Sequence, residues 1–360
     1  MAYTTVNKST DYFNTLLYTG TGSGGSNRQL TGVGFQPDWT WIKNRNSSQE
    51  HVLVDAVRGA TKSLDSSANS AESTTSTQVG AFISDGFQLG SGSVQNRVNG
   101  NGNGLVAWNW KANGQGSSNT DGSINTTYTS VNTTAGFSIS KYTGNATNGA
   151  TVGHGLGAVP DMLIGKDLSD TSGWGVWHKD LTNAGYKLSL NTSDGQADDS
   201  ALFGGSSRTA PTSSVFTLGS GGGLNGSNAN IVYAFTSIKG YSKFGEYGGN
   251  ANANGTFVYT GFKPAFIMLK RKDASTDWLM YDNKRNSSNL VNSRLAANEG
   301  NAEGSDSNGL DFLSNGFKLR TADASWNGND GNPYYYIYMA FASNPFVATS
   351  GTKAIPVTAR

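Results

Sequence analysis

Residues 34–43 read Gly-Phe-Gln-Pro-Asp-Trp-Thr-Trp-Ile-Lys, and a related stretch occurs twice more in the chain. Residues 160–166 read Pro-Asp-Met-Leu-Ile-Gly-Lys, and residues 264–270 read Pro-Ala-Phe-Ile-Met-Leu-Lys. In each copy a proline leads a short apolar run that ends in lysine. Side chains two residues apart share one face of a strand, so the pattern predicts one β-strand that is repeated three times. A repeat at this spacing predicts three structural units.

The same further elements surround each of these Pro-led stretches in the same order. A Tyr-led turn comes first, and 25, 24 and 23 residues separate the lysine from Tyr18, Tyr142 and Tyr247. A second strand that ends in aspartate follows, then a Phe-x-Leu segment, and then a closing aromatic strand. The aspartates are Asp55, Asp180 and Asp282, the Phe-x-Leu segments begin at Phe87, Phe216 and Phe317, and the closing strands cover 106–110, 232–235 and 338–341.

Short strands separated by Gly- and Asn-rich turns are typical of antiparallel β-sandwiches. The sequence therefore predicts an all-β chain of three tandem β-sandwich repeats, of jelly-roll type and lectin-like. Helical periodicity is nearly absent, and 289–299 is the best helix candidate. The predicted modules cover 11–116, 135–243 and 244–346, with a linker at 117–134 and an extended C-terminal tail at 347–360.

Composition excludes several classes of protein. The 26 Lys and Arg residues nearly balance the 25 Asp and Glu residues, and no basic run occurs. Nonspecific binding to nucleic acid needs a concentrated basic surface, so we expect no nucleic-acid partner. The chain has no cysteine, which removes disulfides, zinc ribbons and thiol catalysis. No signal peptide and no apolar membrane span are recognisable, so we expect a soluble protein that is made in a cytoplasm and is not inserted in a membrane.

The sequence offers no catalytic motif and no cofactor site. The Gly-x-Ser-x-Gly elbow of serine hydrolases is missing, and so is a phosphate-binding P-loop. His51, His154 and His178 lie in three different settings, where packing or turn roles are the simplest interpretation. Polysaccharide depolymerisation is the weakest hypothesis, because neither paired carboxylates nor a parallel β-helix repeat stands out. We therefore expect a protein that is not an enzyme and that needs no cofactor.

Two acidic loops are the remaining candidates for a metal, because calcium prefers several oxygen ligands. They cover 194–199 and 327–332. Neither has the ligand spacing of an EF-hand, so plain solvated turns are the favoured interpretation and we expect no metal.

Aromatic residues in polar surroundings are the candidates for ligand binding. Most tryptophans of a sandwich fill its core, whereas Trp326 lies in a polar loop and is expected to be exposed. With the amides and the carboxylate that follow it, Trp326 would form a platform for a sugar. A second candidate pair lies on the second strand of the middle module. The candidate binding residues are Trp326, Asn327, Asn329, Asp330, Trp177 and His178.

The chain as a whole resembles a family of bacteriophage virion proteins. This family is common in marine phages, carries tandem copies of such a module, and is often described as tail-fibre-like. The matching segments span essentially the entire chain, although no catalytic residue or defined ligand comes with them. They cover 1–14, 34–43, 57–62, 239–245, 278–282 and 356–360.

The resemblance implies a place on the virion surface after synthesis in the host cytoplasm. Two roles remain open. The first is an adhesin of tail-fibre type that binds a glycan or protein receptor on the host surface. The second is a purely architectural role in capsid decoration, a knob, a collar or a tail shell, with other virion proteins as partners. Because the C-terminal tail has no pattern of its own, we also expect a homo-oligomer, and a trimer is favoured.

Overall fold

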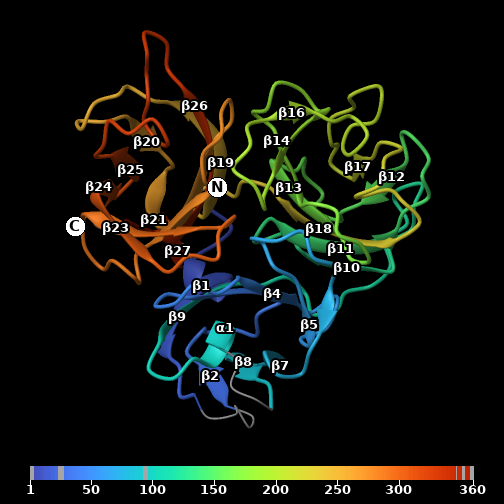
Figure 1. Cartoon of the computed structure of the whole chain (residues 1–360), viewed down its shortest axis with the longest axis horizontal. Coiled ribbons are helices and arrows are strands. Elements are labelled where there is room, and N and C mark those ends of the chain that lie inside the picture. The colour runs from blue at the N-terminus through green and yellow to red at the C-terminus, as the bar shows by residue number, and fades with distance from the viewer. Residues whose placement is uncertain (1–3, 23–27, 92–95, 346, 351–352, 357–360) are drawn as a thin grey trace.

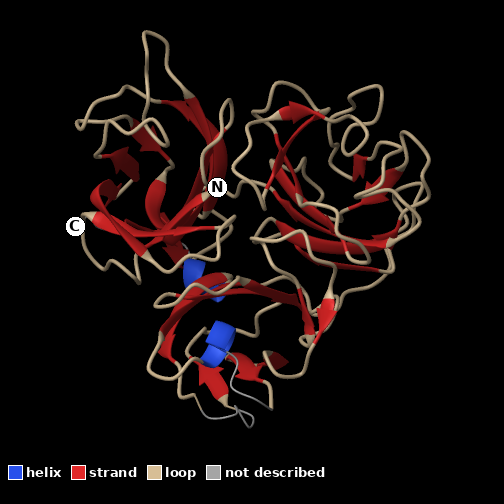
Figure 2. Ribbon diagram, in the orientation of Figure 1, coloured by secondary structure: helices blue, strands red, loops and turns tan. Residues whose placement is uncertain are grey.

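Strands make up nearly all the regular structure of the computed structural model (Figure 2). The structure describes residues 4–22, 28–91, 96–345, 347–350 and 353–356. Within these residues α1 is the one α-helix and has four residues, and all pairings between the named strands are antiparallel. The expected all-β, antiparallel fold is confirmed.

The strands form three lobes, which appear blue to cyan, green, and orange to red in Figure 1. The first lobe contains η1 (Ser9–Asp11), β1 (Phe13–Thr19), β2 (Gln29–Thr31), β3 (Trp39–Asn44), β4 (Val52–Asp55), β5 (Lys62–Ser63), β6 (Ser73–Thr74), β7 (Val79–Ile83), β8 (Gly86–Leu89), α1 (Asn96–Asn99) and β9 (Gly104–Trp110). The second contains β10 (Tyr128–Asn132), β11 (Phe137–Thr143), β12 (Thr151–Gly153), β13 (Met162–Asp167), β14 (Gly175–His178), β15 (Tyr186–Ser189), β16 (Ala197–Asp198), β17 (Val215–Thr217) and β18 (Ala229–Phe235). The third contains β19 (Ser242–Gly248), β20 (Phe257–Tyr259), β21 (Phe262–Arg271), β22 (Leu279–Asp282), β23 (Val291–Ala296), β24 (Gly304–Leu313), β25 (Gly316–Leu319) and β26 (Tyr335–Pro345).

Each lobe contains the same run of four neighbouring strands. The run is β1-β9-β3-β4 in the first lobe, β11-β18-β13-β14 in the second and β19-β26-β21-β22 in the third. In each run the strand of the Pro-led repeat lies between the closing aromatic strand and the second strand of its unit. The sequence repeat is therefore also a repeat of strand order.

The strand register corrects one match made from the sequence. Asp55 and Asp282 each lie opposite the second residue after the proline of their unit. In the second lobe this position belongs to His178, and Asp180 lies two residues beyond it. Each of these three residues follows the lysine of its unit by 12 positions. The match of Asp180 to the two other aspartates is therefore wrong, because side-chain identity took precedence over spacing.

The run of four strands in each lobe is called the inner sheet here. In two of the lobes, the residue after the proline binds the backbone at the point where the pairing of the inner sheet stops. The carboxylate of Asp38 accepts hydrogen bonds from the backbone N–H groups of Ala112 and Gly114, just past β9. Asp161 accepts one in the same way from Ser237, just past β18. Alanine takes this place in the third lobe, where β21 and β26 continue to pair as far as Phe262 and Pro345. The strands are thus shorter in the two lobes that have aspartate at this position and longer in the lobe that has alanine.

The Pro-led strands are buried on both faces, and each face contacts a different core. Trp39 and Trp41 belong to a core that all three lobes share. Ile42, which directly follows Trp41 and faces the other way, belongs to the first lobe's own core. Phe266 and Ile267 divide in the same way between the shared core and the core of the third lobe. Each inner sheet therefore separates a private core from a common one.

Aromatic rings from different lobes meet in the shared core. The rings of Trp39 and Tyr233 stack across the first and second lobes with centroids 4.5 Å apart. Phe13 stacks on Phe341 of the third lobe at 5.0 Å, and Phe341 meets Phe235 of the second lobe edge-on at 6.2 Å. The three lobes thus close around one apolar centre (Figure 1).

Two sets of hydrogen bonds join the lobes in a closed cycle. In the first set, a backbone N–H of each lobe donates to a carbonyl two residues past the repeat lysine of the next lobe. The donor and acceptor pairs are Glu72 and Leu168, Gln196 and Lys272, and Glu303 and Arg45.

In the second set, a ring N–H that precedes the second strand of each unit donates to a carbonyl of the neighbouring lobe. The pairs are His51 and Ala296, Trp174 and Asp65, and Trp278 and Ser189, at 2.8 to 3.0 Å. Each contact between two lobes, called a seam here, thus contains one bond of each set. The contacts between lobes therefore repeat three times, as the strand order does.

Three segments differ from what the sequence predicts for them or add to it. The helix candidate at 289–299 is wrong, since β23 occupies most of it. Part of the predicted linker at 117–134 is β10, which pairs with β11 at the edge of the second lobe's sheet. After Pro345, β27 (Val347–Ser350) and β28 (Lys353–Pro356) pair as a two-stranded antiparallel sheet.

Candidate functional site

The loop that the sequence marks as a binding platform is part of a core. Trp326 is 4% exposed, and its ring stacks on Tyr281 with centroids 5.4 Å apart. Its backbone carbonyl accepts a hydrogen bond of 2.7 Å from the hydroxyl of Tyr247. The expectation of an exposed Trp326 is therefore wrong, because a polar loop sequence can still pack its one large apolar side chain inward.

The same arrangement occurs in all three lobes. The hydroxyls of Tyr18 and Tyr142 donate hydrogen bonds of 2.8 Å to the backbone carbonyls of Val98 and Leu224. Val98 and Leu224 are buried like Trp326. The Tyr-led turn of each unit is thus tied to the loop before the closing strand. Trp326 is the third lobe's version of a core residue that recurs, and its geometry is structural.

The asparagine that follows this core residue is equally structural. Asn327 is fully buried and its amide N–H₂ donates to the carbonyls of Asn252 and Thr321. Its side-chain oxygen accepts the N–H of Asn250. The counterparts Asn99 and Asn225 accept backbone N–H groups of the same turn in their own lobes.

A signal for this device was present in the sequence and was missed. An apolar residue followed by Asn-Gly occurs at 98–100, 224–226 and 326–328, shortly before each closing strand. Because this motif recurs at the same place in all three units, it indicates a structural role. The prediction of a binding role considered the copy with Trp326 alone.

The remaining predicted residues do not form one site. Asn329 is partly buried, and its side-chain oxygen accepts the backbone N–H of Gly331, while Asp330 is exposed. Trp177 is 5% exposed and belongs to the second lobe's own core. His178 is buried and lies on the seam with the third lobe, where burial lowers its pKa to about 3. The structure therefore separates these residues between two lobes and several environments.

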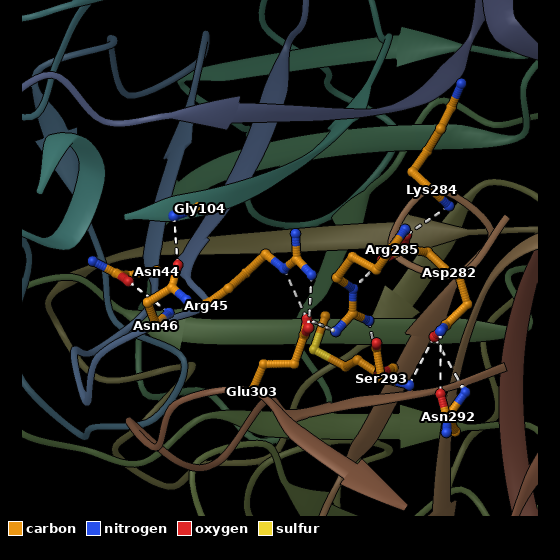
Figure 3. Close-up of polar contacts among 12 residues, drawn as sticks. Asn44, Arg45, Asn46, Gly104, Asp282, Lys284, Arg285, Asn292, Ser293 and Glu303 are labelled. Atoms are coloured by element: carbon orange, nitrogen blue, oxygen red, sulfur yellow. Dashed lines mark hydrogen bonds and ion pairs between the residues drawn. The ribbon is translucent and has the colours of Figure 1, made fainter. Parts of the chain in front are cut away.

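The polar groups that the structure does bring together lie at the seams, as Figure 3 shows for the first and third lobes. The Nε and Nη2 groups of Arg45 donate hydrogen bonds of 2.9 and 2.7 Å to the two carboxylate oxygens of Glu303. The same carboxylate accepts from Arg285, whose guanidinium also pairs with Asp282. Trp108 of the first lobe donates its indole N–H to Asp282 at 3.1 Å. Two arginines and two carboxylates thus bridge this seam.

An equivalent cluster bridges the first and second lobes. Arg58 pairs with Asp55 and Glu72, and Tyr233 of the second lobe donates its hydroxyl to Asp55 at 2.7 Å. The side chains of Arg58 and Asp55 are fully buried. Buried charges of this kind are tolerated where each one is paired and hydrogen-bonded.

The third seam lacks this charge cluster. In the second lobe His178 stands at the position of the aspartate, and Leu181, three residues later, stands at that of the arginine. Gln196 takes the place of the glutamate. Met339 of the third lobe takes the place of the aromatic donor, since it pairs with Met268 as Trp108 pairs with Trp41. At this position the seam between the second and third lobes has no ion pair, whereas the other two seams are ionic there.

Each repeat lysine is buried and binds backbone carbonyls. The ammonium group of Lys43 donates to the carbonyls of Asn44 and of Gly300 in the third lobe, at 2.8 and 3.1 Å. Lys166 and Lys270 likewise donate to two carbonyls each, within their own lobes. Burial lowers the pKa of Lys43 and of Lys270 to about 8. Lys166 and Lys270 thus hold the loop that follows the Pro-led strand, whereas Lys43 ties the end of its strand to the third lobe.

A pocket with a volume of about 690 Å³ lies in the third lobe. Its wall is rich in amides that already hold the backbone. Asn289 exchanges two hydrogen bonds with the main chain of Phe312, and Asn286 accepts the N–H groups of Asn292 and Ser293. The pocket therefore has polar walls whose amides are largely occupied.

Two smaller crevices open at the seams of the third lobe. One, of about 390 Å³, lies between the second and third lobes and is lined by Lys179, Lys239, Lys243 and Tyr259 among others. The other, of about 210 Å³, lies between the third and first lobes and is lined by residues that include Asn14 and Asn283.

The two acidic loops do not gather metal ligands. In the part of the chain that the structure describes, no three His, Asp or Glu side chains converge as a metal site would require. Asp198 pairs with Arg208, and Asp199 pairs with Lys187 at 3.1 Å. The described residues also include no helix of the length and apolarity that a membrane span requires.

Comparison with known proteins gives one result. A family model described as a domain of unknown function, DUF7483, matches residues 8–345. The chain belongs to this family. The single match covers all three lobes, as expected if the lobes and their shared core form one unit. No curated protein and no solved structure matches the chain.

Proposed function

We propose that this DUF7483 protein is a structural component of a bacteriophage particle, exposed on the virion surface, and that it contributes to attachment to the host surface as a tail-fibre-type adhesin. The resemblance of the whole chain to tail-fibre-like virion proteins supports the setting. The observation that carries the role is the closed body of three lobes around one core. Such a body holds its rim loops and crevices rigidly while their side chains remain free to vary.

The finer architecture is part of the same proposal. The three lobes are copies of one antiparallel sandwich module of jelly-roll, lectin-like type. The shared order of the four inner strands and the recurring Tyr, Lys and Asn contacts support this reading. The proposed role is non-catalytic, and the two buried ionic clusters fit it because they join neighbouring lobes.

A particle experiment tests the proposal. Antibodies raised against the purified chain are used to label intact particles for electron microscopy, and the purified chain is added to host cells before infection. We expect labelling at the particle surface and reduced adsorption of the phage. Particles that carry no label would overturn the proposed location, and adsorption that is unaffected by a saturating amount of the chain would overturn the adhesin role.

One observation favours the architectural alternative. The chain has a threefold arrangement of lobes, so a single copy presents three similar edges to a shell or collar that has local threefold symmetry. In this role the chain would be a decoration, knob, collar or tail-shell protein that binds other virion proteins. A cryo-EM map of the particle separates the two roles by showing whether the lobes contact neighbours on several edges or project freely. Homo-oligomerisation as a trimer stays a prediction, which light scattering of the purified chain tests.

A further inference from the structure

The crevice between the second and third lobes, called here the lysine crevice, repeats a feature of the fold with different chemistry. Lys179 directly follows the last residue of β14, and Lys243 is the second residue of β19. At the seam of the third and first lobes the corresponding residues are Asn283 and Asn14, and a crevice opens there too. The fold therefore creates the crevice, and of these two copies only the one between the second and third lobes has lysines at both compared positions.

The charge of Lys243 in the lysine crevice faces no carboxylate among the described lining residues. Three of its described lining residues are lysines, and none is an aspartate or glutamate. Lys179 pairs with Asp161, just outside the lining, at 2.8 Å. The ammonium group of Lys243 instead donates to the backbone carbonyl of Tyr259 at 2.6 Å. Burial lowers the pKa of Lys243, and the positive charge of Lys179 lowers it further.

One wall of the lysine crevice is an exposed aromatic edge strand. Tyr259 is 55% exposed, and the Lys243 ammonium lies 5.3 Å from the centre of its ring. Phe257, two residues earlier on the same face of β20, is 43% exposed. Among the described strands β20 is the last of its sheet, so its outer edge pairs with no further strand there. The strand thus presents two rings beside a positive crevice.

We propose that the lysine crevice binds an acidic sugar residue of a polysaccharide, with the sugar carboxylate at Lys179 and Lys243 and a C–H face of the sugar on the ring of Tyr259. The proposal rests on the attachment role above and names a ligand class for it. The crevice volume of about 390 Å³ accommodates one sugar ring with its substituents. A carboxylate there would offset the mutual repulsion of the two lysines, and its charge-assisted hydrogen bonds are stronger than neutral ones.

Calorimetric titration of the full chain tests the proposal. The probes are short oligosaccharides of hyaluronan, alginate and polygalacturonate, with a neutral cello-oligosaccharide and inorganic phosphate alone as comparisons. We expect at least one acidic oligosaccharide to bind and the neutral one not to bind. Lys243→Met and Tyr259→Ala should each weaken this binding about tenfold or more, which corresponds to about 1.4 kcal/mol.

Tyr335→Ala is the matched control. Tyr335 is an exposed tyrosine of the same lobe with a lysine, Lys272, 5.5 Å from its ring centre, and it does not line the crevice. This variant should bind as the unchanged chain does. Near-ultraviolet circular dichroism of all variants confirms that the fold is kept.

Three results would overturn the proposal. They are no binding of any acidic oligosaccharide, binding that survives both crevice substitutions, and phosphate binding as tight as that of the sugar acid, which would reduce the crevice to a general anion site. Failure here is distinguishable from failure of the attachment role. Surface labelling and inhibition of adsorption by the Tyr259→Ala chain would show attachment that works through another surface.

Discussion

Single ring N–H groups at equivalent positions join the lobes. Trp174 and Trp278 donate through indole nitrogens, and His51 donates through Nε2. The Nδ1 atom of His51 accepts the indole N–H of Trp41 at 2.7 Å, so the proton of the neutral ring lies on Nε2. Burial lowers the pKa of His51 to about 3, so the ring stays neutral at ordinary pH. Different side chains thus supply the same donor.

Trp174→Phe should lower the free energy of unfolding by about 1 kcal/mol beyond its packing loss, because the partly buried carbonyl of Asp65 loses its partner across the seam. Trp177→Phe is the matched control. Trp177 is also buried on this part of the chain, and its indole nitrogen has no hydrogen-bond partner. Urea unfolding of both variants isolates the hydrogen bond as their difference. Equal losses would contradict a role for it in closing the seam.

A second prediction at the residue scale concerns the seam between the second and third lobes, where His178 stands at the position of Asp55 and Asp282. His178→Asp would bring a buried carboxylate to the position of Asp55 and Asp282 without the arginine that accompanies both. An unpaired buried charge costs about 3–5 kcal/mol. His178→Asp should therefore be strongly destabilised in thermal unfolding, and adding Leu181→Arg should recover part of the loss. A double variant no better than the single one would show that this seam cannot hold the ion pair.

At the scale of elements, the positions of the repeated strands could be predicted from the sequence because the repeat is regular where strands pair. Their order within each sheet comes from the structure. Pro-led and closing strands recur with alternating apolar residues, and they are the strands that pair in every lobe. The candidate binding loop was misplaced for the opposite reason. A loop has no periodicity that reveals which side it buries, and the inward turn of Trp326 depends on tertiary contacts with Tyr281 and Tyr247.

The second lobe shows a substitution that local sequence does not explain. Gly165 and Gly175 pair across β13 and β14, where the other lobes pair Ile42 with Val52 and Leu269 with Leu279. Two side chains from distant loops fill the missing volume. A Cβ on Gly165 would lie 2.7 Å from Leu224, and one on Gly175 would contact Leu202. The core volume is thus kept, because interiors are closely packed.

Gly165→Ala should therefore destabilise the chain by about 1–3 kcal/mol through overpacking against Leu224. Leu224→Ala alone should cost about 2–5 kcal/mol, since it leaves a cavity. In the Leu224→Ala background, the added methyl group should cost little or nothing. Chemical unfolding of the four proteins of this double-mutant cycle measures the coupling. Additive losses would show that Leu224 does not fill the space of the missing side chain.

At the scale of the molecule, the sequence shows one pattern of segments three times, but it does not show how these segments close around a shared core. Alternation along the Pro-led strands indicates that both faces carry apolar residues. It does not say whether the second face meets another sheet of the same unit or a neighbouring unit. The lobes meet through Trp39, Phe235 and Phe341, whose partners lie about 100 residues or more away in sequence. Such contacts leave no local pattern.

Because the inner face of each sheet meets the other lobes, a lobe on its own would expose a large apolar surface to water. In the second lobe this face includes Met162, Ile164, Tyr233 and Phe235, all of which are at most 1% exposed in the whole chain. We therefore predict that residues 117–241, which include β10 and end before β19, expressed alone, bind a hydrophobic dye strongly and show no cooperative thermal transition, whereas the full chain unfolds in one transition. Substituting these four residues by Ser or Thr should reduce dye binding by the isolated segment and should prevent folding of the full chain. A segment 117–241 that unfolds cooperatively without dye binding would show instead that each lobe's private core is sufficient and that the shared core only docks finished lobes.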